Sequence, residues 1–277
     1  MSDVAVVIVS YRSGPQIEEL LPTVRAATVE LTITVANNAV DDDLSASLSA
    51  HPSVHLQEMG GNLGYGSAVN EVIRRAAPPD WILVVNPDVV FREGAIDELV
   101  RVGESDARIG MVGPQILTAA GEVYPSARRL PSLRTGIGHA MFSRVWRRNP
   151  WTHRYLSDRE LPPRQRDAGW LSGACLLIRG SVFRELGGFD EGYFMYFEDV
   201  DLGRRVGDAG YRNVYVPSAI ITHSGAHATS SSGRVMIRAH HASAYRYLSG
   251  KYSAWYFWPV RVALRAGLGL RSRLVRR

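Results

Sequence analysis

The chain of 277 residues has an ordinary globular composition, with 45% hydrophobic and 21% charged residues, which excludes a disordered or fibrous protein. Its single cysteine, Cys175, excludes an internal disulfide, a multi-cysteine zinc site and an iron–sulfur cluster, and favours a reducing cytosol. No apolar run approaches the roughly 20 residues that span a bilayer, and the N-terminus is unlike a signal peptide. We therefore expect neither secretion nor a membrane-spanning helix.

The net charge of +5 is unevenly distributed along the chain. Residues 209–277 contain 11 basic and no acidic residues, whereas residues 1–208 contain 21 basic and 27 acidic residues. A near-neutral body with a basic C-terminal segment predicts an anionic partner, either a membrane surface or a nucleic acid. Nucleic acid is not favoured, because the sequence contains no recognised nucleic-acid-binding motif.

Strand and helix patterns alternate over the first 120 residues. The β-branched run Val4–Ser10 is typical of a strand buried on both faces, and the apolar spacing of Pro15–Ala27 predicts a helix. The same criteria give strands at Leu31–Ala36, Val54–Glu58, Trp81–Val85 and from Ile109, and helices at Ser67–Ala77 and Gly94–Gly103. This alternation predicts an α/β protein with a largely parallel sheet.

The pattern changes after residue 120. Residues 120–168 are rich in Arg and Pro without clear periodicity, and we interpret them as an insertion or acceptor loop. Order returns with a predicted strand, Trp170–Arg179, and a helix, Ser181–Leu186, that ends at a glycine pair. Strands are expected within Asn213–Thr222, followed by a helical tail from Val235.

Polar residues follow four of the predicted strands, as Ser10-Tyr11-Arg12, Asn37-Asn38, Asn86-Pro87-Asp88 and His223. In an open α/β sheet, ligands bind beyond the carboxyl ends of the strands. Asp88 could there hold Mg²⁺ or Mn²⁺ against a diphosphate, although Asn-Pro-Asp is also a good turn sequence. His223 could be a metal ligand beside Asp88, a pH-sensitive switch or a structural histidine with its hydrogen bonds satisfied.

A second carboxylate cluster, Glu198-Asp199-x-Asp201, lies among aromatic residues. Carboxylates in such surroundings are candidates for a general base with a shifted pKa. The alternative is that these acids favour a helix N-terminus and pair with Arg204-Arg205 in the next turn.

Two further segments are open to a structural or a binding interpretation. The loop Gly60–Gly66 has neither the dinucleotide fingerprint nor a P-loop, but its backbone N–H groups could face an anion at a helix start. Near the C-terminus, the aromatic cluster Trp255–Trp258 precedes an Arg-rich helix, a combination that suits a membrane interface. The alternative is a solvated terminal helix with one aromatic docking patch.

Taken in order, the stretches VIVSYRS, NLGYGSAVNEVI, NPDVV, WLSGACLLIR and GGFDEGYFMYFEDVDL, followed by His223, resemble the family 2 inverting nucleotide-sugar glycosyltransferases of the GT-A fold. The resemblance covers about residues 4–225. Ser-Ala-Arg-Arg-x-Pro-Ser at 126–132 further resembles bacterial rhamnosyltransferases that act on polyprenyl-diphosphate-linked GlcNAc. The resemblance implies a mixed, mostly parallel sheet flanked by helices, with a catalytic domain at 1–233 and a basic helical tail at 234–277.

The resemblance also implies roles for individual residues. Asp199 would be the general base, supported by Glu198 and Asp201, and Asp88 and His223 would bind a divalent metal, Mg²⁺ or Mn²⁺. Residues implied for the nucleotide are Ser10, Tyr11, Arg12, Asn37, Asn62, Tyr65, Asn70 and Asn86. Residues implied for the acceptor are Trp170, Ser172, Gly173, Arg128 and Arg129.

The implied activity is transfer of L-rhamnose from dTDP-L-rhamnose to a lipid-diphosphate-linked saccharide at the inner face of the cytoplasmic membrane. A homodimer is compatible with this interpretation. The chain departs from the family in having Asn37-Asn38 where Asp-Asn is usual, and one carboxylate rather than two in Asn86-Pro87-Asp88. The alternatives are a UDP- or GDP-sugar transferase with a soluble acceptor, and an inactive sugar-nucleotide-binding scaffold.

Overall fold

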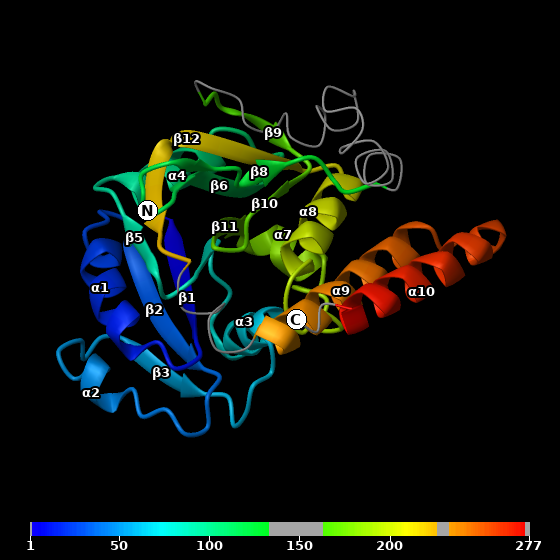
Figure 1. The fold of residues 1–277 in the computed structure, drawn as a ribbon. Helices are drawn as coiled ribbons and strands as arrows, with labels where there is room; N and C mark the ends of the chain where they lie inside the picture. Colours follow the sequence, from blue (N-terminus) through cyan, green and yellow to red (C-terminus); the bar gives the residue numbers. More distant parts are fainter. Residues whose placement is uncertain (1, 133–162, 226–232, 275–277) are drawn as a thin grey trace.

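The computed structural model describes residues 2–132, 163–225 and 233–274 (Figure 1). These residues form a mixed sheet flanked by helices, as predicted. Most of the Arg/Pro-rich insertion predicted at 120–168 lies outside the described residues.

The main sheet has the strand order β3-β2-β1-β4-β11-β6-β12-β5. Its strands are β1 (Asp3–Ser10), β2 (Glu30–Asn37), β3 (His55–Glu58), β4 (Trp81–Val85), β5 (Val89–Phe91), β6 (Ile109–Leu117), β11 (Cys175–Arg179) and β12 (Arg212–His223), with β7 (Val123–Tyr124) on β6 and β9 (Arg166–Ala168) on β12. β2 and β4 are parallel to β1, β11 is antiparallel to both β4 and β6, and β12 is parallel to β6. The strands β1, β2, β4 and β12 therefore run in one direction, and their carboxyl ends share one edge.

Both faces of this sheet are covered by helices, which explains the uninterrupted apolar sequence of β1. Val4, Val6 and Ile8 point to one face and Val7 and Val9 to the other, and all five are buried. The first face packs against α1 (Gly14–Arg25), α2 (Ser45–Leu48) and α4 (Ala95–Glu104), and the second against α3 (Tyr65–Arg75), α7 (Gly180–Glu185) and α8 (Glu198–Asp208).

The strand predicted at Trp170–Arg179 is wrong in one respect, because it is interrupted at Ser172-Gly173-Ala174. Its first part, β10 (Trp170–Leu171), pairs with β8 (Ala127–Arg128) in a separate two-stranded sheet, and only its second part, β11, joins the main sheet. The segment predicted as several strands within Asn213–Thr222 is the single strand β12. The short strands β5, β7, β8 and β9 were not predicted, since runs of two or three residues carry no periodicity.

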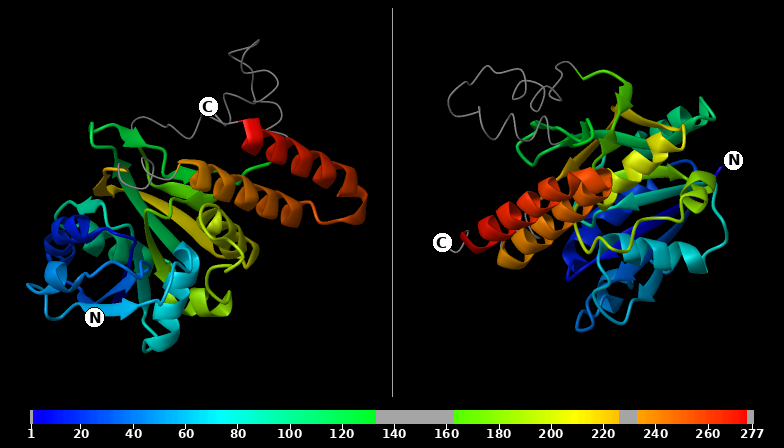
Figure 2. Two further views of the ribbon diagram at one scale, coloured as in Figure 1. Left: turned by 60° about the horizontal axis from the view of Figure 1, so that its bottom comes forward. Right: turned by 90° about the vertical axis from the view of Figure 1, so that its right-hand side faces the viewer.

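The C-terminal segment is helical, as predicted. The helices α9 (Gly233–Lys251) and α10 (Trp258–Leu274) form an antiparallel hairpin that extends from the body, with a 3₁₀ turn, η1 (Trp255–Phe257), between them (Figure 2). Tyr247 of α9 is buried in a small cluster with Tyr193 and Val200, so α9 packs against α8 and the loop before it. The domain boundary at residue 233 stays a prediction. Across the described ranges, no helix has both the length and the apolar character needed to cross a membrane.

Candidate active site

The carboxyl ends of β4 and β12 bring together residues that are 135 positions apart in the sequence. The Nε2 atom of His223 lies 3.1 Å from Oδ1 of Asp88 and 3.3 Å from Nδ2 of Asn86. The shared strand direction makes this possible, because β12 ends at His223 while β4 ends just before Asn86. The structure thus joins the side chains predicted as a metal pair.

Asp88 is a partly buried carboxylate with several donors around it. Its Oδ2 atom accepts hydrogen bonds from the Gly225 amide (2.9 Å) and the Ser224 hydroxyl (3.3 Å). Burial opposes its ionisation, but the hydrogen bond and charge of His223 and the backbone donors outweigh burial and lower the pKa of Asp88 below its usual range. Within the described part of the chain, no group of three His, Cys, Asp or Glu side chains is arranged to hold a metal.

Gly173, in the turn between β10 and β11, connects the two predicted carboxylate clusters. Its amide donates to Oδ2 of Asp199 (2.9 Å), and its carbonyl accepts a hydrogen bond from the Tyr65 hydroxyl (2.7 Å). The next residue, Ala174, accepts from the backbone amide of Asn86 (2.9 Å). A Cβ atom at Gly173 would lie 3.4 Å from Oδ2 of Asp199, in ordinary van der Waals contact, so the Gly173 backbone lies directly against this carboxylate.

Glu198 and Asp199 begin helix α8, where the macrodipole favours acidic side chains. Burial raises the pKa of both carboxyl groups, and the negative charge of Asp199 raises the pKa of Glu198 further. Hydrogen bonds from the amides of Gly173 and Val200 and the charge of Arg128 partly offset burial at Asp199. One oxygen of Glu198, Oε2, is buried without a hydrogen-bond partner among the described residues.

Tyr65, at the start of α3, lies among the carboxylates of the site. Burial raises the pKa of its hydroxyl well above the usual value, and the negative charges of Glu198, Asp199 and Asp88 raise it further. The hydroxyl is therefore a neutral donor, and the Gly173 carbonyl accepts its hydrogen bond. The structure thus puts Tyr65 between the two clusters.

Asp201, by contrast, is not part of this group. Its buried carboxylate is bonded by Arg204 (2.9 Å) and Arg205 (2.7 Å) one turn along the same helix. The structural alternative for this acid is therefore confirmed.

Four of the residues predicted to bind the acceptor lie close together: Arg128, Trp170, Ser172 and Gly173. The pairing of β8 with β10 sets Arg128 beside Trp170, with the guanidinium 5.6 Å from the indole ring. On its other side Arg128 lies 5.5 Å from the ring of Tyr124, a residue that the sequence did not single out. Ser172 follows Trp170 and is half-buried next to Gly173. Arg129, the fifth predicted residue, is exposed, and its carbonyl accepts a hydrogen bond from the Trp170 indole (3.1 Å).

The residues after β1 and β2 form the opposite end of the site. Ser10 is fully buried and its hydroxyl has no partner among the described residues, whereas Tyr11 is 54% exposed and Arg12 pairs with Asp41. The Asn37 side chain is occupied within the protein, since it donates to the Asp42 carbonyl and Glu58 and accepts from the Ala39 amide.

Asn38 was predicted only as part of the polar end of the second strand, without a role in binding the nucleotide. It is buried, its Nδ2 donates to the Gly64 carbonyl (3.1 Å), and its Oδ1 has no hydrogen-bond partner among the described residues. The signal that could have identified it is its place beside Asn37, directly beyond the end of β2.

The loop before α3 contributes less to the site than predicted. Asn62 is exposed and caps the loop by accepting a hydrogen bond from the Gly64 amide (3.1 Å). Asn70 is buried and bonds in both directions with the Phe189 backbone (2.9 Å each). Its amide fixes the Gly188-Phe189 turn within the protein, and the nucleotide contact predicted for Asn70 stays a prediction.

Gly64 allows this loop to approach the segment that precedes α8. It adopts φ +87°, and a Cβ atom would lie 2.4 Å from the Phe194 carbonyl oxygen, so only glycine fits. The neighbouring Tyr65 amide donates to the same carbonyl (3.1 Å). The loop before α3 and the loop before α8 are therefore held in one arrangement.

Comparison with known proteins agrees with this geometry. The family model described as "Glycosyltransferase like family 2" matches residues 2–244. The chain is 45% identical to the N-acetylglucosaminyl-diphospho-decaprenol L-rhamnosyltransferase of Mycobacterium tuberculosis, over 99% of this chain and 94% of that protein. It is 29% identical to the rhamnosyltransferase WbbL of Escherichia coli, over 90% and 93% of the two chains.

Solved structures support the fold. The mannosyltransferase PcManGT of Pyrobaculum calidifontis, in complex with GDP-Man and Mn²⁺, superposes with a TM-score of 0.60 at 16% identity, over 97% of this chain and 70% of that one. GalNAc-T7 with UDP, GalNAc and Mn²⁺ gives the same TM-score at 13% identity, over 97% and 55% of the two chains. The family match and the close relative, together with this fold, show that the chain belongs to glycosyltransferase family 2.

Proposed function

We propose that this enzyme transfers L-rhamnose from dTDP-L-rhamnose to GlcNAc linked through a diphosphate to a polyprenyl lipid. The proposal is supported by the near-complete overlap with the mycobacterial relative, and by the second relative, which is also a rhamnosyltransferase. The observation that carries the transferase chemistry is the single group formed by Asp199, Gly173 and Tyr65 next to the pair Asp88–His223.

We propose Asp199 as the general base of a single displacement. The acceptor hydroxyl attacks C1 of the donor sugar, the bond from C1 to the diphosphate oxygen breaks, and the hydroxyl proton passes to Asp199. The configuration at C1 is thereby inverted without a covalent enzyme intermediate. The Gly173 amide orients one oxygen of Asp199 and the Val200 amide the other, while burial favours the proton-accepting step by raising its pKa.

We further propose that Asp88 and His223, with Asn86 beside them, hold a divalent cation. One carboxylate and one imidazole form only part of a coordination sphere, but Mg²⁺ and Mn²⁺ sites of this kind are commonly completed by substrate phosphates. When bound, such an ion would neutralise charge on the departing diphosphate. The Mn²⁺-containing structural neighbours support the use of a divalent metal.

The donor nucleotide would lie along the ends of β1 and β2. Ser10 and Asn38 each carry a buried polar atom without a partner among the described residues, and such atoms favour a polar ligand or water. Tyr11, Arg12, Asn37, Asn62 and Asn86 remain proposed contacts around them. The side-chain amide of Asn37 already forms hydrogen bonds within the protein, so its proposed contribution is to hold the neighbouring backbone in place.

The acceptor would approach along Arg128, Trp170, Ser172 and Gly173. Arg128 combines a positive charge with a planar group that lies close to the rings of Tyr124 and Trp170, which suits a sugar diphosphate. Arg129 lies at the exposed end of the same strand pair.

The helical hairpin gives a surface that suits an anionic membrane, and we propose peripheral association with the inner face of the cell membrane. Trp255, Tyr256 and Trp258 are 80%, 60% and 59% exposed at the turn of the hairpin. The chain after Asp208 contains no acidic residue to repel anionic headgroups. A lipid-linked acceptor would make such contact useful, since the acceptor diffuses in the membrane plane.

The first prediction concerns the base. Asp199→Asn should lower kcat by about 10²- to 10⁴-fold, because the amide cannot accept the proton, while dTDP still stabilises the protein against heat. The control is Asp208→Asn, the same change on an exposed position of the same helix, with near-normal turnover expected. Near-normal turnover in Asp199→Asn would remove the base assignment.

The second prediction concerns pH. Because Asp199 must be ionised, turnover should be present above its pKa and lost as the pH falls through it, with a midpoint above that of an ordinary aspartate. Arg128 lowers this pKa, so Arg128→Gln should move the acid limb of kcat to higher pH. Arg101→Gln, on a helix across the sheet, should leave the limb in place. An unchanged limb in Arg128→Gln would contradict the electrostatic role.

The third prediction concerns metal and nucleotide together. With Mn²⁺ present, dTDP at about 100 times its Kd should stabilise the protein by about 2.7 kcal/mol, and Asp88→Asn should abolish the Mn²⁺-dependent part of the shift. UDP, GDP and CDP are compared under the same conditions. A larger shift with UDP or GDP would retain the transferase but reject the dTDP donor, and no shift with any nucleotide would favour the scaffold alternative.

The fourth prediction concerns the membrane. The double variant Trp255→Ala/Trp258→Ala should bind phosphatidylglycerol vesicles about tenfold or more weakly in co-sedimentation, since each large side chain contributes about 1.5–3 kcal/mol when buried. Leu56→Ala, an exposed apolar position on β3, serves as the matched control. Equal binding by the double variant and the wild type would reject the hairpin as the contact surface.

A further inference from the structure

The loop that carries the chain into helix α8 has a strained backbone. Tyr196 and Phe197, directly before Glu198, adopt φ angles of 66° and 68°, in a region that non-glycine residues seldom occupy. Two such residues in succession persist only where neighbouring groups hold them. The position of Asp199 depends on this loop, because its helix starts at the end of it.

Helix α9 supplies the groups that hold the loop. The buried Ser243 hydroxyl donates to the carbonyl of Met195 (2.8 Å), the residue immediately before the strained pair. The ring of His240 packs edge-on against both Tyr196 and Phe197, with ring centres 5.5 Å apart in each case. Residues 240 and 243 are three apart and so share one face of α9.

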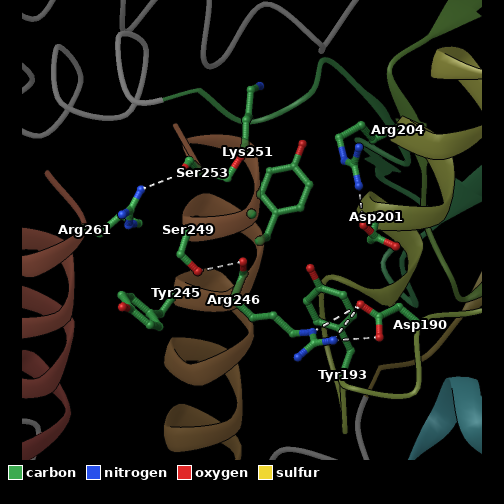
Figure 3. Close-up of a pocket in the computed structure, with 12 residues that line it drawn as sticks. Asp190, Tyr193, Asp201, Arg204, Tyr245, Arg246, Ser249, Lys251, Ser253 and Arg261 are labelled. Carbon is green, nitrogen blue, oxygen red and sulfur yellow. Dashed lines mark hydrogen bonds and ion pairs between the residues drawn. The ribbon is translucent and has the colours of Figure 1, made fainter. Parts of the chain in front are cut away.

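Arg246 continues this face by one more turn. Its guanidinium donates to both carboxylate oxygens of Asp190 (2.9 Å each) and lies 5.3 Å from the centre of the Tyr193 ring. Figure 3 shows Arg246 reaching from α9 across to Asp190 on the loop. The pair is partly exposed, with 49% and 35% of the side chains accessible, so it contributes little to global stability.

A cavity lies beside the contacts between α9 and the loop. A space of about 530 Å³ lies between α9, α8 and the loop, with Asp190, Tyr193, Arg204 and Arg246 in its lining (Figure 3). Beside this space, Tyr193 and Tyr247 pack α9 against the loop in a buried cluster with Val200, whereas at Asp190 the contact between helix and loop is the partly exposed pair with Arg246. The polar contacts of Ser243 and Arg246 therefore add to the apolar packing and fix the loop at Met195 and at Asp190.

We propose that α9 is a positioning element for the general base, with Ser243 and Arg246 as its positioning residues. They hold residues 190–197 so that α8 presents Asp199 to the Gly173 amide and to the acceptor. Arg246 lies beyond residue 244, where the family match ends. This inference rests on the assignment of Asp199 as the base in the proposed function.

The experiment uses the full chain and steady-state kinetics of sugar transfer. Ser243→Ala and Arg246→Ala should each lower kcat by about 10- to 100-fold, because a displaced base loses alignment, while the donor KM stays within about twofold. Arg246→Lys keeps the charge on Asp190 and should recover part of the loss. Asp190→Ala combined with Arg246→Ala should be no slower than either single variant, because all three break the same contact.

The matched control is Ser249→Ala, the same change on the same helix at a hydroxyl that donates to the Arg246 carbonyl of its own helix. Its kcat should stay within twofold of the wild type, and thermal unfolding checks that every variant is folded. A normal kcat in folded Ser243→Ala and Arg246→Ala would overturn the proposal, as would a loss expressed only in the donor KM.

The experiment distinguishes the positioning role of α9 from the assignment of Asp199 as the base. If Asp199→Asn abolishes turnover while the α9 variants turn over normally, only the positioning role is rejected. If Asp199→Asn turns over normally, the base assignment fails and the positioning proposal is overturned with it.

Discussion

The hydrogen bond from the Gly173 amide to the Asp199 carboxylate is the contact on which the site depends. It joins the turn between β10 and β11 to the start of α8, and the same residue receives the Tyr65 hydroxyl on its carbonyl. The following Ala174 carbonyl bonds to Asn86, next to Asp88. A short backbone segment thus aligns elements from three separate parts of the chain.

The carboxylates of the site are held in two different environments. Asp88 accepts hydrogen bonds from His223 and backbone donors, which lower its pKa, whereas burial raises the pKa of Asp199 and Glu198. Groups in such contrasting surroundings are suited to different tasks, one to carry negative charge beside a diphosphate and the other to accept a proton. The pKa values of the two groups move in opposite directions because of where the residues lie. Asp88 lies at a strand end, and Asp199 lies in the first turn of a helix packed on the sheet.

The C-terminal helices both expose an aromatic surface and contact the loop before α8. One end of the hairpin exposes an aromatic cluster at Trp255–Trp258, and α9 contacts the loop that precedes the proposed base. Helix α9 therefore extends from the exposed turn of the hairpin to the loop that precedes Asp199. The basic segment after Asp208 therefore carries positive charge and also contacts the loop next to the site.

Local sequence patterns predicted the alternating strands and helices, the polar strand ends and the acidic block at 198–201, because hydrophobic periodicity and turn chemistry are encoded over a few neighbouring residues. They also pointed to Asp88 and His223, since strands running in one direction place their ends at one edge. Three features became visible in the folded chain alone: Trp170–Arg179 is broken at Gly173, Asn70 bonds to Phe189, and α9 contacts the loop before α8. These features depend on contacts between residues distant in sequence, and such contacts form only when the packed elements bring their side chains within hydrogen-bonding distance.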